Sequence, residues 1–447
     1  AGPRRGRLDR FTLHPDGANF TLGEQTPFLK GIALTDLDWG YDGKLYIADY
    51  GGGWTKSGKG NVYTLAEDSK LKSKGIAEVK NLFANGIPSL KSDKLFELLA
   101  HPDQRVRQRA QFALADHDLE SLPLFEKAIQ PNQPLMRRIH GIWGIGQLGQ
   151  KNPSALNSLA RLIGDKEMEI RANLARTLGN HGKHLAPFRK ALIAMLEDSS
   201  PRVASLAAIA LSNHGHQDAV EPAIKMLEKN DDNDVVVRHA GIMVLTKCAQ
   251  FAPEWKYYDH RSTAVRRAIV IALRRHKSHL LETYFTDRDQ SVRQEAIRAA
   301  YEMDVRKSYR ALSNQAHSIA LKVSPEVKWH PLTARRAIFA AWVLGQAKDA
   351  EVIAKIAANP KIDFRVRKDA LIALLEWNNP PVPDPVTGFA RTLPKNRIKL
   401  DTSIIKDLKG LIDGVDKNSI DLIPRALILS EQEQIPHGEL RLTRYLQ

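Results

Sequence analysis

The sequence predicts a mainly α-helical protein, a solenoid of about nine helix pairs preceded by a small β segment. The first observation is a short motif, an apolar residue followed by arginine, that recurs early in successive helical stretches. Neighbouring copies are 27 to 42 residues apart, and a repeat near 32 residues is typical of stacked helix pairs. Small residues follow each copy at helical spacing. The third observation is a strand-like alternation of polar and apolar residues, confined to the start of the chain.

The motif marks one face of one helix in each repeat. We call its first residue the anchor. It is valine in five full copies and Met136, Ile170 or Ala334 in three relaxed copies; at Val203 the arginine comes one residue early. The eight motif arginines are Arg107, Arg137, Arg171, Arg238, Arg266, Arg293, Arg335 and Arg367. Positions four, seven and eight after the anchor are mostly alanine or leucine, and these offsets share one helical face.

An aspartate or serine precedes many anchors by three residues. These residues are Asp103, Asp234, Asp289 and Asp363, with Ser200 and Ser262 as equivalents. They are N-cap types at the offset that an N-cap requires. The arginine row then has two interpretations. It is either a cationic stripe for a polyanion or an internal ladder, in which each arginine bonds the turn aspartate of its own or the next repeat. The matched aspartates favour the ladder.

The first 66 residues predict strands. Phe11 to Leu13 and Asn19 to Leu22 flank a turn, and two alternating runs, 33–39 and 44–49, flank Tyr41-Asp42-Gly43. An Asp-Gly turn between alternating runs is a strong hairpin signal. With a further strand at 61–65, the segment predicts about one four-stranded blade plus part of a neighbour.

The remaining boundaries follow from composition. Residues 67–91 are mixed and lysine-rich and predict a linker, and the solenoid is expected over 92–377. Four prolines in residues 380–385 predict an extended linker over 378–399, followed by a helical segment or cap over 400–447. The longest gap between anchors holds an insertion, residues 308–331, where Trp329 and His330 are candidates for binding.

Composition excludes several classes of site. The single cysteine, Cys248, rules out an internal disulfide, a cysteine-based zinc site and an attached haem c within this chain. No stretch reaches the length of a membrane span, and no standard catalytic signature is present. Four histidines and Cys248 share one register eleven residues after the anchor, which we assign to helix C-termini instead of a metal site. Net charge is +15, of which +12 falls in residues 76–377.

Two resemblances extend this interpretation. Asp103 to Arg107 and the repeat pattern resemble the HEAT repeat in its short bacterial form. Residues 31–65 resemble the last blade of secreted β-propellers of the sorbosone or glucose dehydrogenase-like, quinone-dependent type. They are similar in particular to large bacterial proteins in which HEAT repeats follow the propeller, often with a c-type cytochrome domain. This resemblance implies a periplasmic or secreted location, and a quinone cofactor or haem c in a full-length parent; a cytoplasmic location is the alternative.

Asp36, Asp38, Asp49 and Trp54 are the candidate site residues of the blade. The three acids could meet a metal or a sugar hydroxyl, or they could bond the turns between blades, which we favour. Trp54 could stack on a sugar or pack on the blade edge.

The preferred function is a non-catalytic scaffold that binds a protein partner or adjacent domains of the same polypeptide. No cofactor is expected in this chain. One alternative is a part of a quinone-dependent sugar dehydrogenase. Another is a basic solenoid that binds nucleic acid or another polyanion, although the expected pairing of the arginines argues against nucleic acid.

Overall fold

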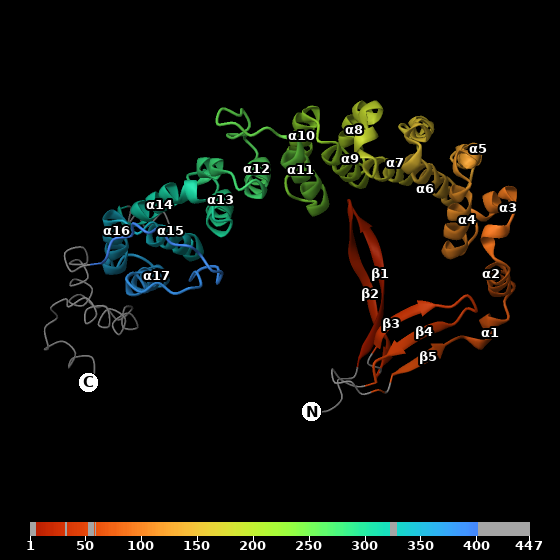
Figure 1. Cartoon of the computed structure of the whole chain (residues 1–447), viewed down its shortest axis with the longest axis horizontal. Coiled ribbons are helices and arrows are strands. Elements are labelled where there is room, and N and C mark those ends of the chain that lie inside the picture. The colour runs from red at the N-terminus through yellow and green to blue at the C-terminus, as the bar shows by residue number, and fades with distance from the viewer. Residues whose placement is uncertain (1–5, 32–33, 52–57, 59, 322–328, 401–447) are drawn as a thin grey trace. The chain divides into compact units, whose positions relative to one another are not determined.

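The structure is a computed structural model that describes residues 6–31, 34–51, 58, 60–321 and 329–400. The chain forms two compact units, Ala1–Ala249 and Gln250–Gln447, which we call unit 1 and unit 2. The described part is a small β segment followed by helical repeats (Figure 1). The predicted α-solenoid is therefore confirmed.

Unit 1 begins with a long antiparallel hairpin. Its strands are β1 (Arg7–Asp16) and β2 (Asn19–Lys30), and they extend beyond the predicted runs on both sides. The turn residue Gly17 has φ +59, a conformation that glycine adopts without steric cost. At the tip, the Ala18 amide donates to Asp234 Oδ2 at 2.7 Å, so the hairpin contacts a helix N-terminus more than 200 residues later in the chain.

The second sheet is a three-stranded meander of β3 (Leu34–Trp39), β4 (Leu45–Asp49) and β5 (Asn61–Leu65). The sequence predicted one four-stranded blade, but among the described strands β1 and β2 pair with each other and not with β3. One face of the meander is mainly apolar, because the strand register places six apolar residues together; they are Leu37, Trp39, Leu45, Ile47, Tyr63 and Leu65. The two on the central strand are buried and the four on the edge strands are exposed.

The segment predicted as a linker is largely helical. It contains α1 (Asp68–Leu71), α2 (Lys74–Asn85) and a 3-10 turn, η1 (Ile87–Ser89). The Ser73 hydroxyl caps α2 by accepting from the Ile76 amide. The Phe83 ring stacks on Tyr41 with centroids 3.7 Å apart, so α2 packs on the β3–β4 turn. The lysines around α2 made the segment resemble a polar linker, although Ile76, Val79 and Phe83 have helical spacing.

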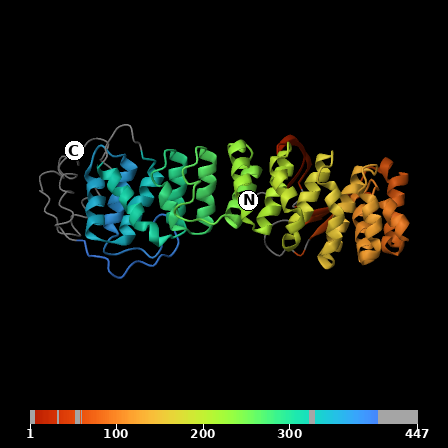
Figure 2. The same ribbon diagram turned by 90° about the horizontal axis from the view of Figure 1, so that it is seen from above.

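The repeats of unit 1 place their anchors in one row of helices (Figure 1). This row is α4 (Gln104–Asp116), α6 (Leu135–Lys151), α7 (Met168–Gly179), α9 (Pro201–His214) and α11 (Val235–Cys248). The other row is α3 (Ser92–Leu98), α5 (Leu122–Ala128), the 3-10 segment η3 (Pro153–Leu162), α8 (Arg189–Ala194) and α10 (Val220–Asn230). Seen from above, the helices stand side by side (Figure 2).

Unit 2 repeats the arrangement. Its anchor helices are α12 (Thr263–Arg275), α13 (Gln290–Glu302), α15 (Pro331–Leu344) and α17 (Phe364–Leu375). The partner elements are the 3-10 segment η8 (His279–Tyr284), α14 (Tyr309–Leu321) and α16 (Ala347–Ala358). Residues 249–262, where a first helix would precede α12, form turns instead. Edge-to-face rings fill this place, with Trp255 5.1 Å from Phe251 and 5.6 Å from Tyr258.

The proline-rich segment that the sequence predicts as an extended linker contains a turn bridged by Pro383 and Ala390, and it packs on the helices of unit 2. Asp384 is buried and accepts from the Tyr301 hydroxyl at 2.6 Å. The Arg397 guanidinium lies between the rings of Trp342 and Trp377, 4.9 and 5.0 Å from their centroids. Burial lowers the pKa of Arg397 to about 10. The segment therefore covers the last repeats. The helices predicted beyond residue 400 lie outside the described residues.

Within the described part of the chain, no helix is long and apolar enough to cross a membrane.

Candidate functional site

The predicted N-caps lie where the sequence placed them. Asp103, Asp234, Asp289 and Asp363 each precede an anchor helix and accept from its first backbone amides, as do Ser200 and Ser262. Four of these helices therefore begin with the same arrangement: an aspartate cap, two further residues and a valine anchor whose side chain is buried. The cap offset fixes which side of the helix faces the core.

The motif arginines bond the turn in front of their own helix. Arg107, Arg171 and Arg266 each donate from Nη1 to the carbonyls six and five residues earlier. For Arg266 these contacts are 2.7 Å to His260 and 3.1 Å to Arg261. Each of these arginines therefore closes its own inter-helix turn.

The carboxylate partner comes from the next repeat, but it is a different aspartate from the one predicted. Arg171 binds Asp198 at 2.7 and 2.9 Å, and Arg266 binds Asp287 at 2.8 and 3.1 Å. These aspartates stand five residues before the next anchor, whereas the aspartate at three residues is occupied as the N-cap. Each also accepts from the cap residue's backbone amide, Ser200 or Asp289. One carboxylate thus joins two successive repeats.

The register of two repeats also needs correction. The buried Arg138, and not Arg137, pairs with the next repeat's Asp165. The cap of α6 is Pro134, three residues before Arg137, so the true anchor position is shifted by one. In α15 the cap is His330, which places Thr333 instead of Ala334 at the anchor position. Methionine and alanine lack the β-branched side chain of valine, so the relaxed copies do not define the anchor position from sequence alone.

The remaining motif arginines also have partners within the protein. Arg137 lies over the Phe96 ring and bonds Gln133, and Arg238 lies 3.7 Å from Asp232. Arg293 donates to the Asp287 carbonyl. The last two are Arg335, which donates to the Pro385 carbonyl, and the buried Arg367, which donates to the Ala357 carbonyl. The row is thus engaged inside the solenoid, which argues against a free cationic stripe.

Removing one ladder carboxylate should destabilise unit 2. In Asp287→Ala the Arg266 guanidinium, only 1% exposed, loses its carboxylate. Leaving a buried charge without its partner lowers the free energy of unfolding by roughly 3–5 kcal/mol. The matched control is Asp259→Ala, because Asp259 pairs with Arg288 at 3.0 Å on the surface, where pairs contribute about 1 kcal/mol or less. Thermal unfolding followed by circular dichroism should show a large loss for the first variant only. Equal small losses would contradict the ladder.

The blade candidates do not form a site. Asp36 and Asp38 are exposed, and each accepts from the next residue's amide at 2.8 Å. Asp49 accepts from the Gly51 amide at 3.0 Å, a turn contact. Trp54 lies outside the described residues. No cluster of three or more metal-ligating side chains occurs in the part of the chain that the structure describes.

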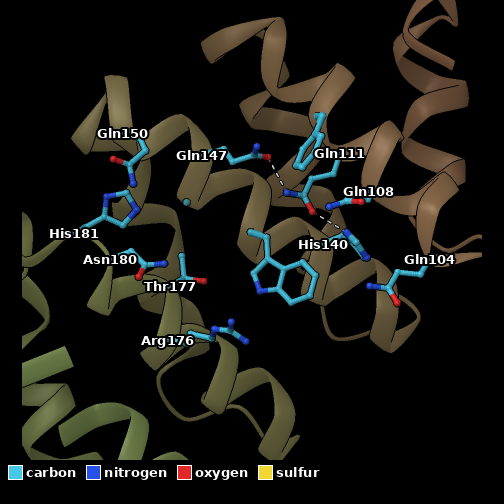
Figure 3. A pocket seen from close by; sticks show the side chains of 13 residues that line it. Gln104, Gln108, Gln111, His140, Gln147, Gln150, Arg176, Thr177, Asn180 and His181 are labelled. Atoms are coloured by element: carbon cyan, nitrogen blue, oxygen red, sulfur yellow. Dashed lines mark hydrogen bonds between the residues drawn. The ribbon is translucent and has the colours of Figure 1, made fainter. Parts of the chain in front are cut away.

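A polar groove lies instead across three successive anchor helices of unit 1, α4, α6 and α7 (Figure 3). It encloses about 410 Å³. Its lining is dominated by amides: Gln104, Gln108, Gln111, Gln147, Gln150 and Asn180. The other lining residues are Phe112, Trp143, Arg176, Thr177, Gly146 and two histidines, His140 and His181. No carboxylate lines the groove.

A relay of hydrogen bonds orients the amides at one end of the groove. Arg107 Nε donates to His140 Nε2 at 3.2 Å, so the imidazole carries its proton on Nδ1. Nδ1 donates to Gln111 Oε1 at 2.7 Å, and Gln111 Nε2 donates to Gln147 Oε1 at 2.7 Å. Gln147 then retains two amide hydrogens with no acceptor among the described residues. The relay presents donors to the groove.

Aromatic and cationic groups complete the surface. The Trp143 indole donates to Asn173 Oδ1 at 3.1 Å, and its ring meets His140 edge to face, which fixes its position. A Cβ on Gly146 would lie 2.6 Å from Thr177 Cγ2, so glycine lets α6 and α7 approach closely. Arg176 is exposed and makes no ion pair with any described residue. The groove therefore combines amides, a fixed indole and one uncompensated cation.

The relay requires a neutral imidazole. Burial, and secondarily the Arg107 charge, lowers the pKa of His140 to about 4. The unfolded value is near 6.5, so between these values the unfolded chain binds the extra proton. The stabilisation by neutral His140 is complete above about pH 6.5 and is lost as pH falls towards 4.

We expect wild-type protein to lose about 2 kcal/mol more stability than His140→Gln between pH 7 and pH 5. Glutamine keeps a donor and an acceptor but does not titrate in this range. Comparing the two proteins removes the contribution of the other histidines. Chemical denaturation at each pH measures the difference, and identical pH dependences would show that His140 is not held neutral by the fold.

The sequence contains a signal for this groove in positions outside the Val-Arg motif. Once α6 is placed in its correct register, Phe112, Trp143 and Arg176 all stand six residues after the anchor in three successive repeats. The glutamines flank the anchor at two residues on either side in α4. These positions lie beside the ladder arginines, and the groove becomes visible in the sequence only when successive repeats are aligned on the corrected anchors.

The insertion candidates line a separate groove in unit 2. Trp329 and His330 lie with α13 and α14 residues around about 290 Å³.

No family model and no curated protein matches the sequence. Similar solved structures include YibA of Escherichia coli, 17% identical with a TM-score of 0.34 over 69% of this chain and 97% of that one. The CpcE and CpcF complex of phycocyanin lyase from Nostoc sp. PCC7120 gives 20% identity and a TM-score of 0.27 over 57% and 87%. Importin beta gives 14% and 0.45 over 78% of this chain and 54% of its own. The likeness is one of helical-repeat fold.

Proposed function

We propose that the protein is an interaction scaffold whose unit 1 groove binds an extended segment of a partner polypeptide. The observation that carries this proposal is the row of amides without internal partners. The side chains of Gln104, Gln108, Gln150 and Asn180 line the groove and make no hydrogen bond to any described residue. An amide both donates and accepts, so it matches the alternating N–H and C=O groups of a peptide backbone.

The spacing of the helices suits an extended chain. Neighbouring helices pack about 8–10 Å apart, and an extended chain rises about 3.3 Å per residue. Each anchor helix therefore meets every third residue of a bound segment. Amides from α4, α6 and α7 can bond the backbone at successive steps, which binds a polypeptide without requiring one sequence.

Side-chain preference follows from the rest of the lining. Arg176 is a cation with no compensating carboxylate in the groove, so it favours an acidic residue in the ligand. Phe112, 38% exposed, and the half-buried Trp143 offer an apolar surface beside it. The ligand class is an extended segment that carries an acidic residue near an apolar one.

Selection from a displayed library of random peptides, about 12 residues long, on the full chain should enrich this class. Fluorescence anisotropy of an enriched, labelled peptide should then show a loss of about tenfold or more in affinity for Arg176→Glu and for Trp143→Ala. The matched control is Arg161→Glu, because Arg161 is exposed and lies outside the groove.

Two results would overturn the proposal: no enrichment over the Trp143→Ala/Arg176→Glu double variant, or equal losses for Arg161→Glu and Arg176→Glu. Circular dichroism of each variant confirms that the helices remain folded. A loss confined to misfolded variants would count against the groove.

We also propose that this scaffold belongs to a larger dehydrogenase-like protein with a periplasmic or secreted location. The support is the resemblance of residues 31–65 and the exposed apolar face of the meander, where Trp39 is 56% exposed. Any quinone or haem c would lie in that parent. Coding sequence on either side that lacks further blades would contradict this proposal.

A further inference from the structure

We infer that unit 2 carries a second groove for the same class of ligand, formed by α13, α14 and Trp329. This inference rests on the proposed function of the first groove. It begins from a repeated motif. Gln104-Arg105-Val106-Arg107-Gln108 returns as Gln290-Ser291-Val292-Arg293-Gln294, the same glutamines on either side of a valine anchor.

The two copies occupy equivalent places in the fold. Each follows an aspartate N-cap, Asp103 or Asp289, and each anchor valine is fully buried. The glutamines two residues before and two residues after the anchor therefore project in the same direction from α4 and from α13. In both units these two glutamines line a groove.

The chemistry of the second groove matches the first although its other residues come from different elements. Trp329, half-buried, supplies the aromatic surface, and Arg293, whose Nη1 also donates to the Asp287 carbonyl, supplies the cation. The rest of the lining is polar and includes Gln315, Thr286, Ser318, His330 and Thr333. None of the lining residues is a carboxylate. Charge complementarity again favours an acidic residue in an extended segment.

Gln315 is the independent sign that the groove receives a ligand. It is only 9% exposed, and its amide makes no hydrogen bond to any described residue. Its remaining exposure is to the groove, where a peptide backbone would satisfy both its donor and its acceptor.

Two grooves of one class make the chain bivalent. Because they lie in different units, each has its own lining residues and can be disabled without altering the other. The partner then presents two extended segments, or two copies of it bind one chain. Simultaneous binding of linked segments raises the apparent affinity about 100-fold or more where the linker can span both sites.

The test is the binding stoichiometry of the peptide selected on the full chain, measured by isothermal titration calorimetry. Wild-type protein should bind two peptides per chain. Trp143→Ala/Arg176→Glu should bind one, Gln294→Ala/Trp329→Ala should bind one, and the combination of all four changes should bind none. Phe389→Ala is the control, because Phe389 is 76% exposed and lies outside both grooves; it should bind two.

The outcomes separate the two proposals. One peptide per wild-type chain, with no effect of the Gln294→Ala/Trp329→Ala change, overturns the second groove and leaves the first. Binding that survives the Trp143→Ala/Arg176→Glu change undiminished at two per chain overturns both. Binding lost only through the unit 2 variant overturns the proposed function and retains the second groove. Circular dichroism excludes unfolding in each variant.

Discussion

The carboxylate that links one repeat to the next is the interaction on which the rest of the solenoid depends. An ion pair such as Arg266–Asp287 is expensive to bury unless its remaining hydrogen-bonding groups are satisfied. Here they are: Nη1 reaches two turn carbonyls, and the carboxylate also accepts from the next helix's cap amide. The guanidinium geometry thus fixes the turn of one repeat and the helix start of the next at once. Where the pair is formed, at Arg138, Arg171 and Arg266, it holds the anchor of one repeat in register with the cap of the next.

The groove of unit 1 arises where this ladder is interrupted. The turn before α6 carries Asn132, whereas the turns before α7, α9 and α13 carry aspartates that pair with the preceding repeat, Asp165, Asp198 and Asp287. Arg107 still bonds its own turn carbonyls, but its Nε has no carboxylate ahead and donates to His140 instead. The charge beside it helps to keep the imidazole neutral, and the neutral imidazole orients Gln111 and Gln147. A single change in the ladder therefore turns a structural arginine towards a surface of amides.

The period of the Val-Arg motif and the aspartates three residues before it were enough to predict the solenoid and its helix starts, because both are local along one helix. The ladder partner was mistaken because pairing between repeats depends on turn geometry, which places the aspartate five residues before the anchor within reach and assigns the nearer one to capping. The groove gathers side chains from α4, α6 and α7 that are some 30 residues apart at each step. In α6 the sequence pattern placed the anchor at Met136, one residue before its true position, and so it did not reveal that Phe112, Trp143 and Arg176 align. The pairing of β1 with β2, separate from β3, likewise depends on tertiary contacts that strand propensity alone does not predict.

The basic character of the repeats does not by itself determine what they bind. Most of the motif arginines bond turn carbonyls or carboxylates within the solenoid. The unit 1 groove exposes amides around one guanidinium that has no ion-pair partner among the described residues. Binding to a polyanion weakens steeply with salt in proportion to the number of charges neutralised. A ligand that meets one cation per groove would depend on salt weakly and on backbone hydrogen bonds strongly. Under the proposed function the arrangement would favour an extended polypeptide with few charges. The net charge of the solenoid would then influence the rate of encounter more than the identity of the partner.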